Sequence, residues 1–417
     1  MYGRLSREES ILDFTHSPRA QSYIERLETF MAEEVYPNEK RFHQERSAPG
    51  QRWKSPPILL ELKSKARSLG LWNLFLTEPP HGAGLSHLEY APLAELMGRV
   101  SWSAEVFNCS APDAGNMEIL WRYGTAEQQQ TWLHPLLEGQ IRSCFAMTEP
   151  AIASSDPVNL VTSIRREGDS YLINGHKWFV TNAQSEACRV MIVMGKSAPL
   201  TAERHLQHSQ VLVPMDTPGV EILRSLTTFG YDDAPVGHAE IKLTDVRVPV
   251  TNILLGEGRG FEVAQGRLGA GRIHHCMRLI GAAQRALELA CQRAVSRTTF
   301  GQKLADHGSI REDIAISAAE IEQARLLTLR AADKMDREGA KAARDLIAMA
   351  KISVPAAAAR IIDRAIQMHG AAGFTDDYPL AEAYVYSRSV RIIDGPDQVH
   401  LRALGKDTIH KYTADPH

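Results

Sequence analysis

The sequence predicts an α+β protein of several domains: an N-terminal helical domain, a central antiparallel β-barrel or sheet domain, and a C-terminal four-helix bundle. The main observation is that the period of the hydrophobic pattern changes twice along the chain, from helical to strand-like and back. The second is size, since 417 residues with 44% apolar and 23% charged composition exceed one small globular module. We expect domain boundaries at 1–142, 143–255 and 256–417.

Charge and cysteine content exclude several classes of protein. Lys plus Arg total 47 against 50 Asp plus Glu, so no global positive field recruits nucleic acid. The five cysteines are scattered and form no C-x-x-C pair, which indicates a reducing compartment. The N-terminus lacks a signal pattern, and no uncharged apolar run reaches the roughly 18 residues of a membrane span. We therefore expect a cytoplasmic protein without a membrane span.

The pattern of the first 140 residues predicts helices separated by turn-forming Pro and Gly segments. Ser55-Pro56-Pro57, Pro79-Pro80-His81-Gly82 and Gly124 interrupt the helical pattern. This region is predicted to be helical with intervening loops.

From about 141 to 250, short runs of β-branched and aromatic residues replace the helical period. The predicted strands centre on 171–173, 178–180, 190–193, 211–213 and 239–243. Gly168-Asp169 and Asn174-Gly175 lie between such runs, and Asn-Gly accepts the positive φ angles of a type I′ turn. We expect both dipeptides to form turns of an antiparallel sheet or barrel.

Beyond Gly260 the helical period returns in three long stretches, each with a seam of apolar or small residues spaced three and four apart. The seams run over 277–294, 310–335 and 347–361. Small residues such as Ala324 and Ala357 allow helices to approach closely. Pro355 lies within the third seam and is expected to kink that helix.

Glycine and histidine clusters in the same half do not indicate a nucleotide or metal site. The glycines at 256–260 and 269–271 lack the G-x-G-x-x-G spacing and a surrounding βαβ unit. His274-His275, and His205 with His208, have no neighbouring carboxylate or cysteine set. We expect no metal.

Two segments near the predicted strands carry unusual chemistry. Phe145–Pro150, followed by Ser154-Ser155-Asp156, gathers hydroxyls and main-chain groups where a strand begins. Asn174–Asn182 adds aromatic rings and a hydroxyl. Together they suit a polar, planar ligand, although a sheet that packs against helices would also use such aromatic residues.

In this order and spacing, the two segments resemble the flavin-contacting motifs of the acyl-CoA dehydrogenase family. The resemblance covers nearly the whole chain, because Gly124–Gln128, Pro135–Leu137, Arg297–Gly301, Gln367–Phe374 and Asp394–Val399 complete the set. The segments Asn108–Asp113 and Ala151–Asp156 are most similar to the subgroup of animal members ten and eleven, represented here by the dehydrogenase part only. The family fold agrees with the three regions read from the pattern.

The resemblance implies FAD as cofactor and assigns residues to it. Phe145, Met147 and Thr148 would line the flavin ring, Phe179 would lie beside its face where many relatives have Trp, and Thr181 would bond near N5. Arg297 and Thr299 would hold the pyrophosphate of a neighbouring subunit's FAD, which implies a homodimer or homotetramer. Further nucleotide contacts would come from His307, Gln367, Gly370, Ala371, Asp397 and Gln398.

The resemblance also implies an acyl-CoA substrate and a catalytic carboxylate. Ser155, Arg272 and Gly395 would contact the substrate, and Asp394 would remove the α proton while the β hydride passes to flavin N5. The family usually has Glu at this position, so the side chain is about one methylene shorter, and a misplacement of about 1 Å can cost roughly 100-fold in rate. Burial beside the flavin is expected to raise the carboxylate pKa.

Several alternatives stay open at the level of sequence. An electron-transfer flavoprotein is the expected electron acceptor. The Asp base and the subgroup resemblance also suit processing of a 4-hydroxyacyl-CoA or 4-phosphoacyl-CoA, and a nitroalkane-oxidase-like flavoenzyme would use an Asp too. The remaining alternative is an inactive binding or assembly partner, against which the presence of Thr181, Arg297 and Asp394 argues.

Overall fold

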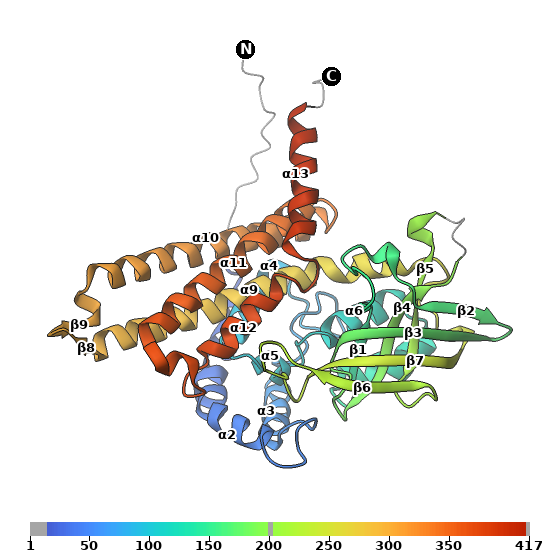
Figure 1. Cartoon of the computed structure of the whole chain (residues 1–417), viewed down its shortest axis with the longest axis horizontal. Helices are drawn as coiled ribbons and strands as arrows, with labels where there is room; N and C mark the ends of the chain where they lie inside the picture. The colour runs from blue at the N-terminus through green and yellow to red at the C-terminus, as the bar shows by residue number, and fades with distance from the viewer. Residues whose placement is uncertain (1–14, 199–202, 414–417) are drawn as a thin grey trace.

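The structure, a computed structural model, describes residues 15–198 and 203–413. Figure 1 shows the strands gathered at one end of the molecule and the long C-terminal helices extending away from them, with the N-terminal helices beneath. Within the described residues, no helix is long and apolar enough to cross a membrane.

Short helices with clear start signals form the N-terminal region. Capping boxes begin α4 and α7, where Ser86 pairs with Glu89 and Thr125 with Gln128, and Pro57 occupies the first position of α3. The predicted helices with intervening loops are confirmed. They are α1 (Pro18–Phe30), α2 (Glu39–Arg46), α3 (Pro57–Ser68), α4 (His87–Gly98), α5 (Ser103–Val106), α6 (Asp113–Tyr123), α7 (Ala126–Gln128) and α8 (His134–Leu137).

The central region forms one curled sheet of seven strands among the described residues. The strands are β1 (Arg142–Ala146), β2 (Ser163–Glu167), β3 (Ser170–Thr181), β4 (Cys188–Lys196), β5 (His208–Pro214), β6 (Val220–Leu226) and β7 (His238–Pro249). Their order is β1-β4-β2-β3-β7-β6, with β5 paired to β4. Most extended pairs are antiparallel, as predicted, but β1 pairs with β4 in parallel. The sheet is therefore mixed.

Both faces of β4 and β5 are covered, which explains their continuous apolar runs. Val190, Ile192 and Leu212 belong to the large core that they share with the helices. The alternate residues Met191 and Val193 pack into a second core inside the curl of the sheet. Because successive side chains of a strand point to opposite faces of the sheet, β4 contributes to both cores.

The predicted hairpin turn at Asn174-Gly175 is wrong, whereas Gly168-Asp169 does connect β2 to β3. Asn174 and Gly175 lie inside β3, where the pairing with β7 shifts register between Ile173 and Gly175. A Cβ at Gly175 would lie 2.3 Å from Thr162 Oγ1, so the glycine serves a close approach within a bulge rather than a turn.

The C-terminal helices are α9 (Gly260–Ser296), α10 (Gly308–Glu338), α11 (Arg344–His369), α12 (Leu380–Val390) and α13 (Asp397–Thr413), with a small hairpin of β8 (Thr298–Thr299) and β9 (Gln302–Lys303) after α9. The three predicted seams fall on α9, α10 and α11. Pro355 lies buried within α11, and it does not end the helix, which continues to His369.

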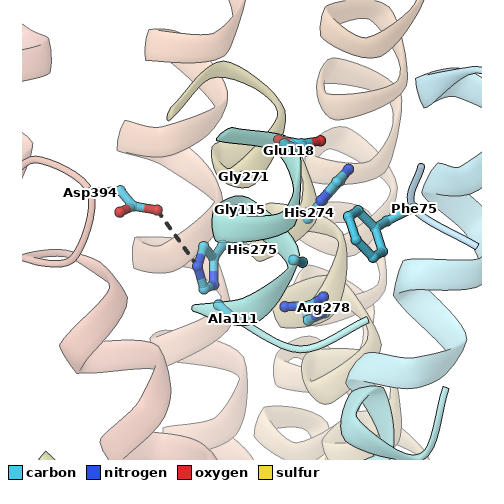
Figure 2. Close-up of a pocket in the computed structure, with 10 residues that line it drawn as sticks. Phe75, Ala111, Gly115, Glu118, Gly271, His274, His275, Arg278 and Asp394 are labelled. Carbon is cyan, nitrogen blue, oxygen red and sulfur yellow. Dashed lines mark ion pairs between the residues drawn. The ribbon is translucent and has the colours of Figure 1, made fainter. Parts of the chain in front are cut away.

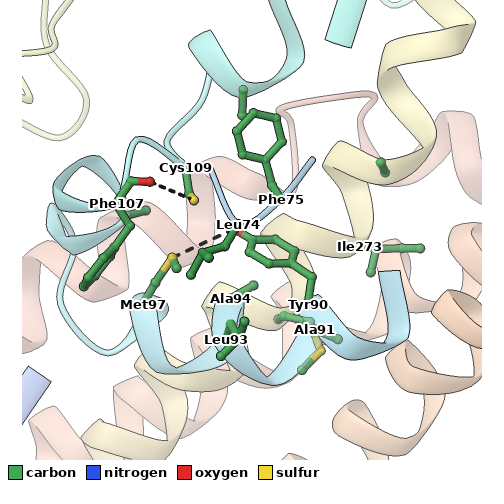
Figure 3. Packing of buried hydrophobic residues seen from close by; sticks show 14 of the residues in the cluster. Leu74, Phe75, Tyr90, Ala91, Leu93, Ala94, Met97, Phe107, Cys109 and Ile273 are labelled. Carbon is green, nitrogen blue, oxygen red and sulfur yellow. Dashed lines mark hydrogen bonds between the residues drawn. The ribbon is translucent and has the colours of Figure 1, made fainter. Parts of the chain in front are cut away.

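The N-terminal and C-terminal helices share one core. Figure 3 shows Tyr90 of α4 and Ile273 of α9 packed with Leu74, Phe75 and Phe107, which come from the loops between helices. The backbones of α4 and α9 themselves come very close, because a Cβ at Gly98 would lie 2.1 Å from Arg278 O, and one at Gly281 1.9 Å from Glu95 O. These two glycines fix how α9 lies against the N-terminal region.

We predict that Gly281→Ala destabilises the protein by at least about 2 kcal/mol, because the methyl group would overlap backbone atoms that have no rotamer by which to move. Urea unfolding followed by circular dichroism measures the change. Gly405→Ala is the matched control, since Gly405 lies in α13 with open space around it and should gain stability slightly. Equal stability of Gly281→Ala and the parent chain would contradict this account of the α4–α9 contact.

Candidate active site

Five of the predicted cofactor residues lie on β1, β3 and the segment that follows β1. We call them the sheet platform: Phe145, Met147, Thr148, Phe179 and Thr181. Thr148 Oγ1 donates to Trp178 O at 2.6 Å, and Trp178 N donates to Thr148 O at 3.1 Å. These two bonds join the segment after β1 to β3, so the residues from both segments are held together.

Phe179 presents an aromatic ring to solvent at the end of β3. Its φ is +49° and it is 44% exposed, unusual for a large apolar residue in a strand. The ring lies 5.1 Å from that of Trp178 and 6.0 Å from that of His238, measured between centroids. The platform is therefore an apolar surface with two threonine hydroxyls beside it.

A buried lysine behind the platform fixes it. Lys177 Nζ donates to Met147 O at 2.8 Å and Met194 O at 2.7 Å, and pairs with Glu149 at 2.9 Å. Burial lowers the pKa of Lys177 to about 8 despite the adjacent carboxylate of Glu149. The conformation of the Met147–Glu149 segment thus depends on an ion pair inside the sheet.

Asp394 lies in the turn between α12 and α13, in the left-handed conformation with φ +56°. Its carbonyl oxygen accepts from Arg272 Nε at 3.1 Å and lies 3.3 Å from His400 Nε2. Lys351 Nζ donates to Val390 O at 2.5 Å and Gly395 O at 3.2 Å. Burial lowers the pKa values of Arg272, Lys351 and His400, that of His400 to about 4.

The Asp394 carboxylate faces a small cavity beside α6 and α9. Figure 2 shows His275 pointing toward it, and His275 Nε2 lies 3.6 Å from Asp394 Oδ2. His275 Nδ1 is 2.9 Å from Tyr386 Oη. The cavity has a volume of about 30 Å³ and is lined by Phe75, Ala111, Ala114, Gly115, Glu118, Gly271, His274, His275, Arg278 and Asp394. A substituent of a few atoms fits there without movement of the walls.

Tyr386 contacts His275 of the cavity and lies within electrostatic reach of the loop that carries Asp233. Burial raises the pKa of Tyr386 to about 12, and the carboxylates of Asp394 and Asp233 both contribute to the rise. Asp233 in turn contacts His238, which lies beside Thr181 of the platform. One buried phenol therefore lies within electrostatic reach of the carboxylate and of the loop behind the platform.

Six other predicted cofactor residues lie at the opposite end of α9. Arg297 and Thr299 follow its 37 residues, a length of about 55 Å, whereas the sheet lies near its beginning (Figure 1). Arg293 Nη2 donates to His369 O at 3.1 Å, so Gln367, Gly370 and Ala371 lie at the same far end, and His307 follows the hairpin. One chain does not bring the two groups together.

The remaining predicted site residues differ in exposure and in the partners that they already have. Ser155 is exposed in the loop after β1, and Gln398 is exposed on α13. Asp397 is buried, with its Oδ2 2.7 Å from Arg391 Nε, so it is engaged within the chain. Arg272 uses its Nε to hold the Asp394 carbonyl oxygen.

Models of three protein domains match the chain in sequence: the acyl-CoA dehydrogenase N-terminal domain over 17–140, the middle domain over 144–246 and the C-terminal domain over 258–409. The chain belongs to the acyl-CoA dehydrogenase family. This family is one of flavin-dependent oxidoreductases.

Individual acyl-CoA dehydrogenases resemble the chain along its length. Mouse acyl-CoA dehydrogenase family member 10 is 54% identical over 395 residues, which cover 94% of this chain and 37% of the mouse protein. FadE2 of Mycobacterium tuberculosis is 52% identical, with 95% and 96% covered. A solved acyl-CoA dehydrogenase structure from Mycobacterium abscessus is 47% identical with a TM-score of 0.92, covering 96% and 100%. The chain spans only about half or less of the animal members' length.

Sequence reasoning missed the residues that position this acyl-CoA dehydrogenase site from behind. Lys177, Lys351 and His275 were not assigned a role, although Lys351 lies among the buried residues Ala350 and Val354 of α11. A lysine in a buried register position is a usable signal, because its charge must find partners there. Which carbonyl groups it would find could not be read from the sequence.

We predict that Lys351→Met lowers the catalytic rate by about 10- to 100-fold, because Val390 and Gly395 lose the donor that holds the Asp394 turn. The measurement is the rate of anaerobic flavin bleaching by an acyl-CoA, with bound flavin and helix content checked in parallel. Lys341→Met, at an exposed lysine in the turn after α10, is the matched control. A full rate in Lys351→Met would show that the turn keeps its position without this lysine.

Proposed function

We propose that the protein catalyses α,β-dehydrogenation of an acyl-CoA thioester, with Asp394 as the base. The observation that carries the proposal is the placement of Asp394. Its carboxylate faces a cavity, Arg272 and His400 contact its carbonyl oxygen, and Lys351 holds the neighbouring carbonyl groups of Val390 and Gly395. Removal of an α proton needs such a fixed carboxylate.

The cofactor is FAD, and the chemistry of the platform fits it. An isoalloxazine ring is planar with polar edges, and the platform offers the exposed ring of Phe179 together with the hydroxyls of Thr148 and Thr181. FAD supplies the acceptor, at N5, for the hydride from the β carbon. The role of the chain is to place the β carbon and that acceptor together and to keep water out.

The base function of Asp394 rests on its immediate contacts. The side chain is 18% exposed, and His275 Nε2 lies 3.6 Å from its Oδ2. The bonds from Arg272 and His400 go to the carbonyl oxygen of Asp394, and its carboxylate faces the cavity. The α proton therefore passes to Asp394 from a carbon that the thioester has acidified.

The separation of the two cofactor groups supports a shared site between subunits. Six predicted cofactor residues lie beyond the C-terminal end of α9, whereas the sheet packs near the start of that helix: Arg297, Thr299, His307, Gln367, Gly370 and Ala371. They would hold the pyrophosphate and adenosine of a second copy's FAD, which makes the active form a homodimer or homotetramer.

We further propose an electron-transfer flavoprotein as electron acceptor. We also propose a cytoplasmic location, in keeping with the free cysteines.

We predict that Asp394→Asn abolishes flavin bleaching by saturated acyl-CoA under anaerobic conditions, while FAD stays bound, because the amide cannot take up the α proton. Stopped-flow absorbance over a panel of chain lengths measures this. Asp333→Asn, a surface acid of α10 that pairs with Arg337, is the matched control. Bleaching of Asp394→Asn at the wild-type rate would remove Asp394 from the role, and a colourless protein that takes up no FAD would remove the enzyme function altogether.

A second candidate is the processing of an acyl-CoA with a hydroxyl or phosphate at C4, favoured by the polar lining of the cavity. His274 Nε2 and Arg278 Nε are buried there without a hydrogen-bond partner among the described residues. Burial holds the pKa of His274 well below its usual range, so its imidazole is neutral. An all-hydrocarbon chain would leave both groups unpaired, whereas a polar substituent would satisfy them.

For this candidate we predict that 4-phosphoacyl-CoA releases phosphate, and that Arg278→Met reduces turnover of the 4-substituted substrate at least about tenfold more than that of the unsubstituted one. Comparing two substrates on the same variant removes any general loss of folding. Equal losses, or no phosphate release, would exclude the candidate. Oxygen consumption with a nitroalkane but none with any acyl-CoA would instead favour the nitroalkane-oxidase-like alternative.

A further inference from the structure

A carboxylate, an imidazole and a hydroxyl form a chain of hydrogen bonds that ends at the platform. His238 Nε2 lies 2.8 Å from Asp233 Oδ2, and His238 Nδ1 lies 3.0 Å from Thr181 Oγ1. Thr181 and His238 are directly paired across β3 and β7. The His238 side chain is 15% exposed, so these bonds are partly shielded from water.

The backbone fixes the position of the carboxylate in this chain. Asp233 begins a tight turn in which Val236 N and Gly237 N both donate to its carbonyl oxygen at 3.0 Å. Gly237 O then accepts from Asn182 N, also at 3.0 Å, which ties the turn to the residue after Thr181. Arg52 pairs with the neighbouring Asp232 at 2.5 Å. These bonds fix the loop, so the Asp233 carboxylate is held beside His238.

When the His238 imidazole is neutral, the order of the three groups decides the direction of each bond. An ionised carboxylate only accepts, so His238 carries a proton on Nε2 and donates it to Asp233. In the neutral imidazole, Nδ1 is then an acceptor, and Thr181 must donate its hydroxyl proton to it. The proton of Thr181 is thus directed into the sheet, and the lone pairs of Oγ1 are left for a partner on the open side.

We infer that Asp233 and His238 are positioning residues that make Thr181 a hydrogen-bond acceptor toward the flavin and so favour its reduced form. The inference rests on the proposed placement of FAD on the platform. N5 of oxidised flavin is a hydrogen-bond acceptor, so it forms no hydrogen bond with the lone pairs of Thr181 Oγ1. Reduced N5 carries a hydrogen and would donate it to Thr181 Oγ1. The hydrogen bonds from Asp233 through His238 to Thr181 therefore stabilise the reduced flavin relative to the oxidised flavin.

The test is the midpoint potential of the FAD-loaded protein, measured by reductive titration against a reference dye without any acyl-CoA. We predict that His238→Phe lowers the potential by about 30 mV, which corresponds to a tenfold change for a two-electron couple. Without the imidazole, the Thr181 hydroxyl is free to donate to oxidised N5. Asp233→Asn, a milder change at a part-exposed residue, should shift the potential less in the same direction and guards against misfolding of His238→Phe.

The decisive comparison repeats His238→Phe in a Thr181→Val background. If the imidazole acts through the hydroxyl, the second substitution adds no further shift once Thr181 is gone. The same shift in both backgrounds would mean that His238 acts by field or packing, and no shift in either would also overturn the inference. A Thr181→Val protein with an unchanged potential would show that the flavin does not contact Thr181, which contradicts the proposed cofactor placement as well.

Discussion

A buried cluster of charges at the start of β1 is the constraint on which the placement of the site depends. Arg142 pairs with Asp113 of α6 and Glu105 of α5, each at 2.8 Å, and Lys63 of α3 pairs with Glu105 at 2.6 Å. Burial alone would raise the pKa of Glu105, but Arg142 and Lys63 hold it at about 2. Loss of one partner from such a cluster typically costs about 3–5 kcal/mol, because a charge is left unpaired in the interior.

The cluster joins the sheet to the helices at two strands. Asp113 accepts from the backbone N–H of Ser143 at 2.6 Å, and Asn182 donates to Ser143 O at 2.9 Å. Ser143 lies in β1, the strand that carries Phe145, and Asn182 follows Thr181 directly. The two halves of the platform therefore take their position from one set of buried charges, while α9 takes its own from the close contact at Gly98 and Gly281.

The sequence could predict the regions and the motifs, but not the details that depend on long-range pairing. Helical seams are local, so 277–294, 310–335 and 347–361 fall where the pattern puts them. Asn174-Gly175 was misread because a bulge and a turn use the same residues, and only the contact with Thr162 distinguishes them. The parallel pairing of β1 with β4 joins segments more than forty residues apart, which no local pattern encodes.

The short side chain of Asp394 is matched by an unusually constrained backbone. A carboxylate that lacks one methylene has fewer rotatable bonds with which to search for a substrate carbon, so its reach is set mainly by where its Cα lies. Asp is one of the few residues that accept the left-handed conformation observed here, and Glu would do so less readily. Arg272 and His400 contact the carbonyl oxygen of Asp394 itself, and Lys351 donates to those of Val390 before it and Gly395 after it. The shorter acid and the fixed turn are thus two parts of one arrangement, in which backbone position replaces side-chain length.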